Sequence, residues 1–123
     1  MAMNVSWNEI GNHDEVTLKS ALVAADKGKV CKLSANDTGA LGSAEDLIFG
    51  LIKQVDDDGG LTVQHEGFIT VTYTGSAPSV GQAELACNGS GGVKLVATPG
   101  TPGKKYLVVN VDTSGTKVTF KLF

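Results

Sequence analysis

The spacing of glycine is the feature that most constrains how this chain can fold. Sixteen of the 123 residues are glycine, against an average of about 7% in globular proteins. The glycines separate short runs rich in Val, Thr and Leu, and strand-like runs separated by turn residues at intervals of about ten residues are typical of sandwiches and barrels. The sequence therefore predicts a mainly β protein, a small β-barrel or sandwich, with roughly seven to nine strands and at most one or two short helical turns.

The clearest predicted strand is "FITVTYT", residues 68–74. Ile69, Val71 and Tyr73 alternate with hydroxyl-bearing threonines. Because successive side chains of a strand point to opposite faces, one face of this strand is apolar and the other is rich in hydroxyl groups. The other predicted strands are 15–20, 28–34, 47–55, 61–65, 82–88, 93–98, 104–112 and 117–123.

Two connections in the first half of the chain have recognisable patterns. The segment "ANDTGALG", residues 35–42, has the small and polar composition of a loop. It is followed by "SAED", whose Ser-x-x-Asp spacing can cap one helical turn at Ser43. The run "LIFGLIKQV", residues 47–55, is almost continuously apolar and predicts a strand covered on both faces.

The densest group of carboxylates lies in "VDDDGGLTVQHEG", residues 55–67. A calcium loop of the EF-hand type beginning at Asp56 needs a ligand at its fifth position and glutamate at its twelfth, where this chain has Gly60 and Gly67. Three successive aspartates repel one another in a dry site, but at a solvated turn their charges are screened, and Asp-Gly supplies the positive φ that a hairpin needs. The segment predicts a hairpin tip, with a weak divalent-ion site as the alternative.

Charge argues against nucleic acid as a partner, and the length of the apolar runs argues against a membrane span. The formal net charge is −3 and all ten basic residues are lysines spread along the chain, so the planar guanidinium fork that reads guanine and clamps phosphate is missing. The N-terminal stretch does not have the pattern of a signal peptide, and no run approaches the ~18 apolar residues of a membrane span. We expect the protein to be made and kept in the cytoplasm of the producing cell.

Reactive side chains do not form a catalytic pattern. Cys31 and Cys87 lie in separate predicted strands without a Cys or His at metal-ligand spacing, so we expect small buried apolar residues, with a disulfide as the alternative. His13 and His65 have no cysteine partner by sequence, and "GSGG" at 89–92 lacks the Gly-x-Ser-x-Gly spacing of a nucleophile elbow. We expect no enzyme activity, no cofactor and no metal.

Aromatic residues suggest a different kind of function. Most of them lie in apolar runs and are expected to fill the core, which leaves Trp7, Tyr73 and Phe123 as candidates for an exposed platform that stacks on sugars. A small β-sandwich module that binds carbohydrate or serves in adhesion is therefore the alternative function.

The N-terminus differs from the rest of the chain. Residues 1–14 show no sustained hydrophobic period, yet they contain the only tryptophan, Trp7, with Val5 and Ile10 close by in sequence. Such a segment either packs on its own domain or binds a partner surface. We therefore expect an irregular, flexible arm at 1–14 and a single β-rich domain at 15–123.

The order of the strand-like segments resembles the small head decoration proteins, or capsid cement proteins, of tailed bacteriophages. The resemblance extends from Lys27 to Leu122, and its pieces are largely strands and turns. They are a "G-x-V-x-K-L" strand, an "IFG" strand, the "GFITVTYTG" hairpin strand, a "PSVG" corner and a Gly-rich turn before "VKL".

That resemblance implies both a fold and a role. The fold is a β-tulip-like barrel that assembles as a homotrimer on the outer face of the expanded head. There it binds the major capsid protein and stabilises capsomer contacts against the pressure of packaged DNA, so that the protein ends in the virion after assembly in the host cytoplasm. In several such proteins an N-terminal arm becomes ordered on the capsid, and the matching arm residues in this chain are Asn4, Val5, Trp7 and Ile10.

Overall fold

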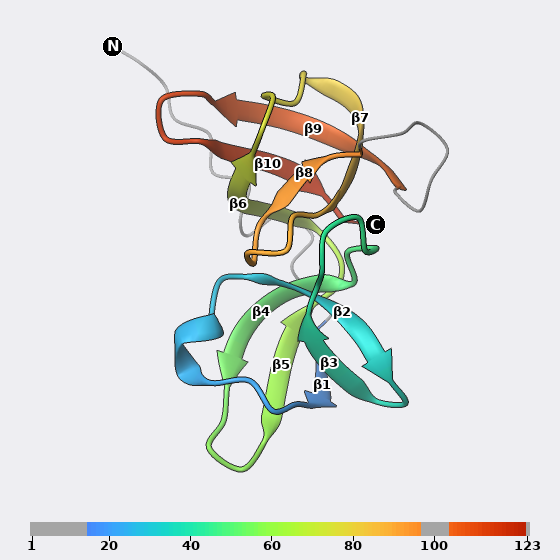
Figure 1. The fold of residues 1–123 in the computed structure, drawn as a ribbon, viewed down its shortest axis with the longest axis vertical. Helices are drawn as coiled ribbons and strands as arrows, with labels where there is room; N and C mark the ends of the chain where they lie inside the picture. The colour runs from blue at the N-terminus through green and yellow to red at the C-terminus, as the bar shows by residue number, and fades with distance from the viewer. Residues whose placement is uncertain (1–14, 97–103, 123) are drawn as a thin grey trace.

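In the computed structural model, the described residues are 15–96 and 104–122, and they are mainly β-structure (Figure 1). The prediction of a mainly β protein is confirmed, and the single three-residue helical turn lies within the predicted number. The described part of the chain forms ten strands, slightly more than the sequence indicated. The elements are β1 (Glu15–Lys19), η1 (Ala24–Asp26), β2 (Val30–Ala35), β3 (Thr38–Leu41), β4 (Gly50–Val55), β5 (Gly60–Gln64), β6 (Phe68–Thr74), β7 (Gly81–Cys87), β8 (Val93–Leu95), β9 (Lys104–Asp112) and β10 (Lys117–Lys121).

The strands close into two five-stranded barrels that follow one another along the chain. The first has the order β1-β3-β2-β4-β5, and the second has the order β6-β8-β7-β9-β10. The barrels are stacked along the long axis of the molecule, with the first at the bottom of the view in Figure 1. Residues 65–67 connect the last strand of the first barrel to the first strand of the second.

The two barrels have the same connectivity. In each, the first strand pairs in parallel with the third and antiparallel with the fifth, while the second strand pairs with the third and the fourth. The hairpin between the fourth and fifth strands carries a similar sequence in both, "VDDDGG" at 55–60 and "VDTSGT" at 111–116. The structure therefore contains an internal repeat that the hydrophobic pattern of the sequence does not reveal.

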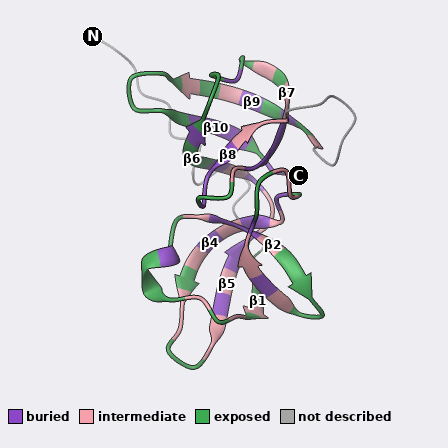
Figure 2. Cartoon of the chain, viewed as in Figure 1, coloured by how far each residue is buried: buried purple, intermediate pink, exposed green. Residues whose placement is uncertain are grey.

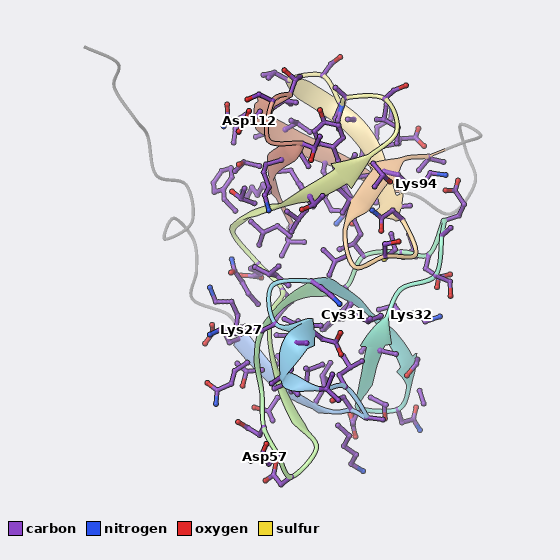
Figure 3. The ribbon with its side chains drawn as sticks, turned by 60° about the vertical axis from the view of Figure 1, so that its left-hand side comes forward. Lys27, Cys31, Lys32, Asp57, Lys94 and Asp112 are labelled. Carbon is purple, nitrogen blue, oxygen red and sulfur yellow. The ribbon has the colours of Figure 1, made fainter. Side chains whose placement is uncertain are left out.

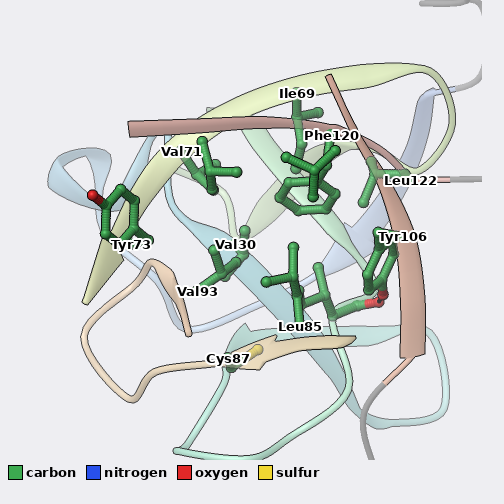
Figure 4. Packing of buried hydrophobic residues seen from close by; sticks show 13 residues of the cluster. Val30, Ile69, Val71, Tyr73, Leu85, Cys87, Val93, Tyr106, Phe120 and Leu122 are labelled. Carbon is green, nitrogen blue, oxygen red and sulfur yellow. Dashed lines mark hydrogen bonds between the residues drawn. The ribbon is translucent and has the colours of Figure 1, made fainter. Parts of the chain in front are cut away.

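Each barrel encloses an apolar core, and Figure 2 shows buried residues in both. The larger core also receives side chains from the first barrel, among them Val30 in Figure 4. The smaller cluster is built around Cys31, Ile52, Leu61 and Val63. The larger one contains Tyr106 and Phe120, whose rings meet edge to face with centroids 5.0 Å apart. Val30 belongs to β2 of the first barrel, yet it is completely buried within this larger cluster.

Backbone hydrogen bonds join the two barrels. The amide of Val30 donates to the carbonyl of Gly91 (2.9 Å), the amide of Glu45 donates to Cys87 (2.9 Å), and the amide of Cys87 donates to Asp46 (2.9 Å). Such bonds satisfy backbone groups at the junction, where exposure to water is reduced. The segment between β3 and β4 is thereby fixed to β7 of the second barrel.

The strand at 68–74 is confirmed in detail. Residues Phe68–Thr74 form β6, in which Ile69, Val71 and Tyr73 are buried and Thr70, Thr72 and Thr74 are exposed. The hairpin predicted at "VDDDGG" is also confirmed, because β4 and β5 pair antiparallel on either side of it.

Three local predictions were wrong. Residues 35–42 are not all loop: Asn36 and Asp37 form a tight turn, and β3 pairs antiparallel with β2. Asp37 has φ 55°, a conformation that Asp tolerates better than most residues. No helical turn begins at Ser43, since Glu45 has φ 72°, which lies outside the right-handed helical region.

The third wrong prediction concerns the apolar run at 47–55. The strand starts only at Gly50, and Leu47 is 54% exposed instead of covered on both sides. The cause is the junction itself, because the hydrogen bonds of Glu45 and Asp46 to β7 hold the preceding chain away from the line of β4.

None of the helices in the described residues has the length and apolar character that crossing a membrane requires.

Candidate functional site

A groove of about 540 Å³ lies at the junction of the barrels, on the surface of the described residues. One side is the outer part of β2, with Lys32 and Leu33, and the other is the segment from Glu45 to Phe49. Leu33 and Leu47 are 52% and 54% exposed, so two large apolar side chains on opposite walls face solvent. Exposed apolar side chains that line one hollow make it a candidate binding surface.

The groove also has an open strand edge. β4 pairs with only the first two residues of β2, Val30 and Cys31. The carbonyl of Cys31 accepts from the amide of Phe49 on the β4 side, and peptide groups two residues apart point to the same side of a strand. Leu33 lies beyond this pairing with β4, and its partner in the sheet is Gly39 of β3 on the other side of β2.

Ion pairs hold the rim of the groove in shape. Lys32 Nζ lies 2.8 Å from Asp46 Oδ2, and Lys94 Nζ lies 2.7 Å from Glu45 Oε2. The hydrogen bond from Lys32, followed by one from the amide of Ser43, lowers the pKa of Asp46. Asp46 therefore stays ionised at neutral pH and ties the segment at 45–49 to β2, while Glu45 ties it to β8.

The described chain begins beside one end of this groove. Phe49, on the groove wall, stacks on the ring of His65 with centroids 5.9 Å apart and an interplanar angle of 15°. His65 follows Gln64, which is paired with Glu15, the first residue of β1. A short path thus leads from the point where residues 1–14 join β1 to the groove.

A second, smaller hollow of about 240 Å³ is lined mostly by polar side chains and glycines. It lies between the outward face of β6, the turn at Gly28 and the loop at 88–92. The loop is fixed by Asn88, whose Oδ1 accepts from the amides of Ser90 (2.7 Å) and Gly92 (3.0 Å). Lys117 Nζ donates to Thr72 Oγ1 at 3.2 Å, so hydroxyl and ammonium groups lie together on this surface.

The acidic hairpin tip lies at one end of the molecule. Asp57 is at the far end of the first barrel and Asp112 at the far end of the second, as Figure 3 shows. Asp58 Oδ1 accepts from the amide of Gly60 (3.0 Å) and Asp56 Oδ1 accepts from Gln54 Nε2 (2.7 Å), so two of the three carboxylates serve the turn. Within the described residues, no three metal-ligating side chains gather into a candidate ion site.

Both cysteines are free and buried, as the sequence indicated. Burial raises the pKa of Cys31 to about 12 and that of Cys87 to about 11. The thiolate is the reactive form of cysteine, so these side chains act as small apolar core residues.

The residues predicted for binding have different outcomes. Asn4, Val5, Trp7 and Ile10 lie outside the described residues, as does Phe123. Tyr73 is 5% exposed, so the expectation that it could join a sugar-stacking platform is wrong: it lies on the inward-facing register of β6 with Ile69 and Val71.

The groove itself was not predicted. Its leucines were assigned to continuous strands, where an apolar residue implies burial. The available signal was the unusual length of the apolar run 47–55, which exceeds the typical strand of about five to six residues.

Comparison of the chain with protein-family models and with curated proteins gives no match.

Proposed function

We propose that this protein is a structural component of a bacteriophage virion that binds the outer surface of the expanded head and stabilises contacts between capsomers. It acts by binding alone and has no catalytic role. The proposed partner is the major capsid protein, and the proposed assembly on the capsid is a homotrimer.

The observation that carries this proposal is the resemblance from Lys27 to Leu122, taken together with the mainly β fold. The resembling segments lie in regular elements: "GKVCKLS" contains most of β2, "GFITVTYTG" contains β6, and "PSVG" leads into β7. The strands of the described residues close into two barrels, an architecture that suits a clamp.

Weak contacts are sufficient for such a role. Once one subunit of a trimer has bound the capsid, the second and third contacts form as if within one molecule. The high effective concentration of these binding sites can raise the overall avidity by about 10²–10⁴ over that of a single contact. The proposed contact is the arm with Asn4, Val5, Trp7 and Ile10. An extended arm that adds to a sheet edge gains backbone hydrogen bonds, and apolar side chains supply the anchoring.

Co-sedimentation tests the proposal. Purified protein is mixed with expanded, undecorated capsids of the phage that carries the gene, and the capsids are pelleted. We expect saturable co-sedimentation at micromolar protein. The absence of binding at that concentration would contradict the proposal.

Deletion of residues 2–12 tests the arm. We expect the melting temperature to change by a few degrees at most, while capsid binding is abolished. If the deletion variant does not fold, Trp7 belongs to the core and the arm is not a separate binding element.

Carbohydrate binding is the second candidate, and the polar hollow favours it. Thr72, Asn88 and Lys117 present hydroxyl, amide and ammonium groups that can bond to sugar hydroxyls. A glycan array probed with the labelled protein tests this function, and loss of a positive signal in Thr72→Val would assign it to this hollow.

A further inference from the structure

We propose that the polar hollow beside β6 binds a phosphate or sulfate group, with the ammonium groups of Lys29 and Lys117 as its principal contacts. The inference goes beyond the proposed capsid role and does not rest on it. It bears on the second candidate function, because it names an anionic group and not a neutral sugar as the ligand of this hollow.

The first argument is the charge of the lining. The described residues that line the hollow include two lysines, Lys29 and Lys117, and no carboxylate. The whole chain has a formal net charge of −3, so this lining differs in sign from the protein as a whole. A lysine ammonium is a common partner of phosphate in proteins. The lining therefore favours an anion over a cation.

The carboxylates nearest in the fold do not cancel this charge. Asp26 Oδ1 lies 3.0 Å from Lys29 Nζ and offsets one of the two lysines. Asp112 is the partner of Lys117 in the β9–β10 ladder, but its Oδ1 accepts from the amides of the turn at 114–115. Within the described residues Lys117 forms no ion pair. One positive charge thus remains uncompensated at the hollow.

The second argument is that both lysines are already held in place. Lys117 Nζ donates to Thr72 Oγ1 at 3.2 Å, and Lys29 Nζ donates to Asp26 Oδ1 at 3.0 Å. The stem of Lys29 lies on the backbone of Gly91, where an added Cβ would be 2.6 Å from Lys29 Cδ. Each ammonium has three hydrogens to donate, so both keep donors for a ligand. Side chains that are fixed beforehand lose less entropy on binding.

The third argument is the hydroxyl groups of the outward face of β6. Thr72 Oγ1 accepts from Lys117 Nζ, and Thr74 Oγ1 accepts from Asn88 Nδ2 at 3.2 Å. Because a hydroxyl carries one hydrogen of its own, each threonine keeps that hydrogen for a ligand. Asn88 Oδ1, in contrast, already accepts two backbone bonds. The hollow therefore offers mainly donors, which suits an oxyanion, whereas a neutral sugar also needs acceptors for its hydroxyl hydrogens.

The fourth argument is size and position. The volume of about 240 Å³ lies below the range of about 300–1,000 Å³ that is usual for small-molecule pockets, so the hollow fits one small group. Both barrels form it: Lys29 precedes β2, and the loop between β7 and β8 reaches the first barrel, as Figure 1 shows. In that loop the carbonyl of Gly91 accepts from the amide of Val30 at 2.9 Å. A bound anion would therefore link the two barrels.

Titration of the intact free protein with inorganic phosphate tests the site. Sodium phosphate replaces sodium chloride at constant ionic strength, and heteronuclear NMR follows the backbone amides. We expect saturable shifts in the millimolar range at Thr72, Ser90 and Gly91, and sodium sulfate should move the same amides. Shifts that do not saturate, or that are spread evenly over the surface, would show general ion screening and would overturn the proposal.

Lys117→Gln is the site variant and Lys121→Gln is the matched control. Both lysines are exposed on β10, but Lys117 pairs with Thr72, whereas Lys121 pairs with Phe68 and does not line the hollow. We expect Lys117→Gln to raise the Kd for phosphate about tenfold or more, because a charge-assisted hydrogen bond is lost. Lys121→Gln should change it by less than about twofold, since a distant exposed charge is screened. Equal changes would overturn the hollow as the site.

Thr72→Val repeats the test without a change in net charge. It removes the hydroxyl that holds Lys117 and that would donate to the anion. We expect the Kd for phosphate to rise by about threefold or more. An unchanged Kd would overturn the assignment of β6 to the site.

A phosphate or sulfate group can come as the free ion or as part of a larger molecule such as a sugar phosphate, so the titration is repeated with glucose-6-phosphate and with glucose. Tighter binding of glucose-6-phosphate than of inorganic phosphate supports a sugar-borne group, and equal or weaker binding supports the free ion. Binding of glucose as tight as that of its phosphate would overturn the proposal. All these measurements use the free protein, so a failure to bind capsids would contradict the proposed function and leave them intact.

Discussion

The two cysteine side chains have the same environment in different barrels. Cys31 and Cys87 are at most 1% exposed, and their raised pKa values of about 12 and about 11 arise chiefly from burial. We expect neither thiol to react with Ellman's reagent near pH 8 in the folded protein and both to react in denaturant. A fast-reacting thiol in the folded protein would show that one of the barrels opens readily.

Asp112 gives the stability of the protein a dependence on acid. Its Oδ1 accepts hydrogen bonds from the amides of Gly115 (3.0 Å) and Ser114 (3.1 Å). The bond from the Gly115 amide, followed by the bond from the Ser114 hydroxyl, lowers the pKa of Asp112 from its ordinary value of 3.8. Because the folded pKa is the lower one, this contribution is fully present above about pH 4 and is lost as the pH falls through the folded value.

The variant Asp112→Asn isolates that contribution, since the amide keeps an acceptor oxygen but has no charge. We expect its melting temperature to lie below that of the unaltered protein at neutral pH, and the difference to shrink as the pH falls below about 4. A difference that stays constant with pH would assign the effect to geometry and not to charge.

At the level of elements, β6 allows a test of which face is buried. Val71 is 3% exposed and faces the core of the second barrel, whereas Thr72 faces outward. Val71→Thr places a hydroxyl in that core and should lower the free energy of unfolding by about 1–3 kcal/mol. Thr72→Val is the reverse substitution on the outward face, and it should change the free energy of unfolding by no more than about 0.5 kcal/mol. Chemical denaturation measures both, and equal effects would contradict the assigned register.

Elements whose structure is set by their own local sequence were predicted correctly, whereas features set by contacts between distant residues were not. The alternation at Ile69, Val71 and Tyr73 is local, and so is the Asp-Gly turn at 58–59, and both were predicted correctly. The exposure of Leu47 depends on two hydrogen bonds with Cys87 of β7, one donated by the Glu45 amide and one accepted by the Asp46 carbonyl, some forty residues along the chain. No local pattern encodes such a contact, so the groove could not be predicted.

β3 is a strand that was predicted as loop, because contacts with distant residues and not its own sequence hold it in the sheet. Its four residues, Thr38–Leu41, include a glycine and an alanine and have little intrinsic preference for a strand. They are held there by pairing with β2 and by the closure of the barrel against β1. Gly39 is needed at this position, because a Cβ there would lie 2.8 Å from the Leu61 side chain in the core.

At the scale of the whole molecule, Val30 couples the two barrels. It is fully buried, it belongs to β2, and it packs in the core that the second barrel encloses. Val30→Ala should lower the free energy of unfolding by on the order of 2 kcal/mol. Because the lost contacts span the junction, we expect hydrogen exchange to accelerate in both barrels. Acceleration confined to the first barrel would show that the two unfold separately.

The repeated connectivity has a consequence for the history of the chain. Tandem duplication of a shorter gene, encoding one barrel of roughly 50 residues, is the simplest origin of two copies of the same strand order. A domain of that size buries only about 60% of its surface and is marginally stable alone, so the ancestral product would have been favoured by pairing with an identical copy. On that origin, fusion would have made the pairing permanent and released the copies from symmetry. The carboxylate-rich tip of one barrel and the hydroxyl-rich tip of the other are the kind of divergence that such a release permits.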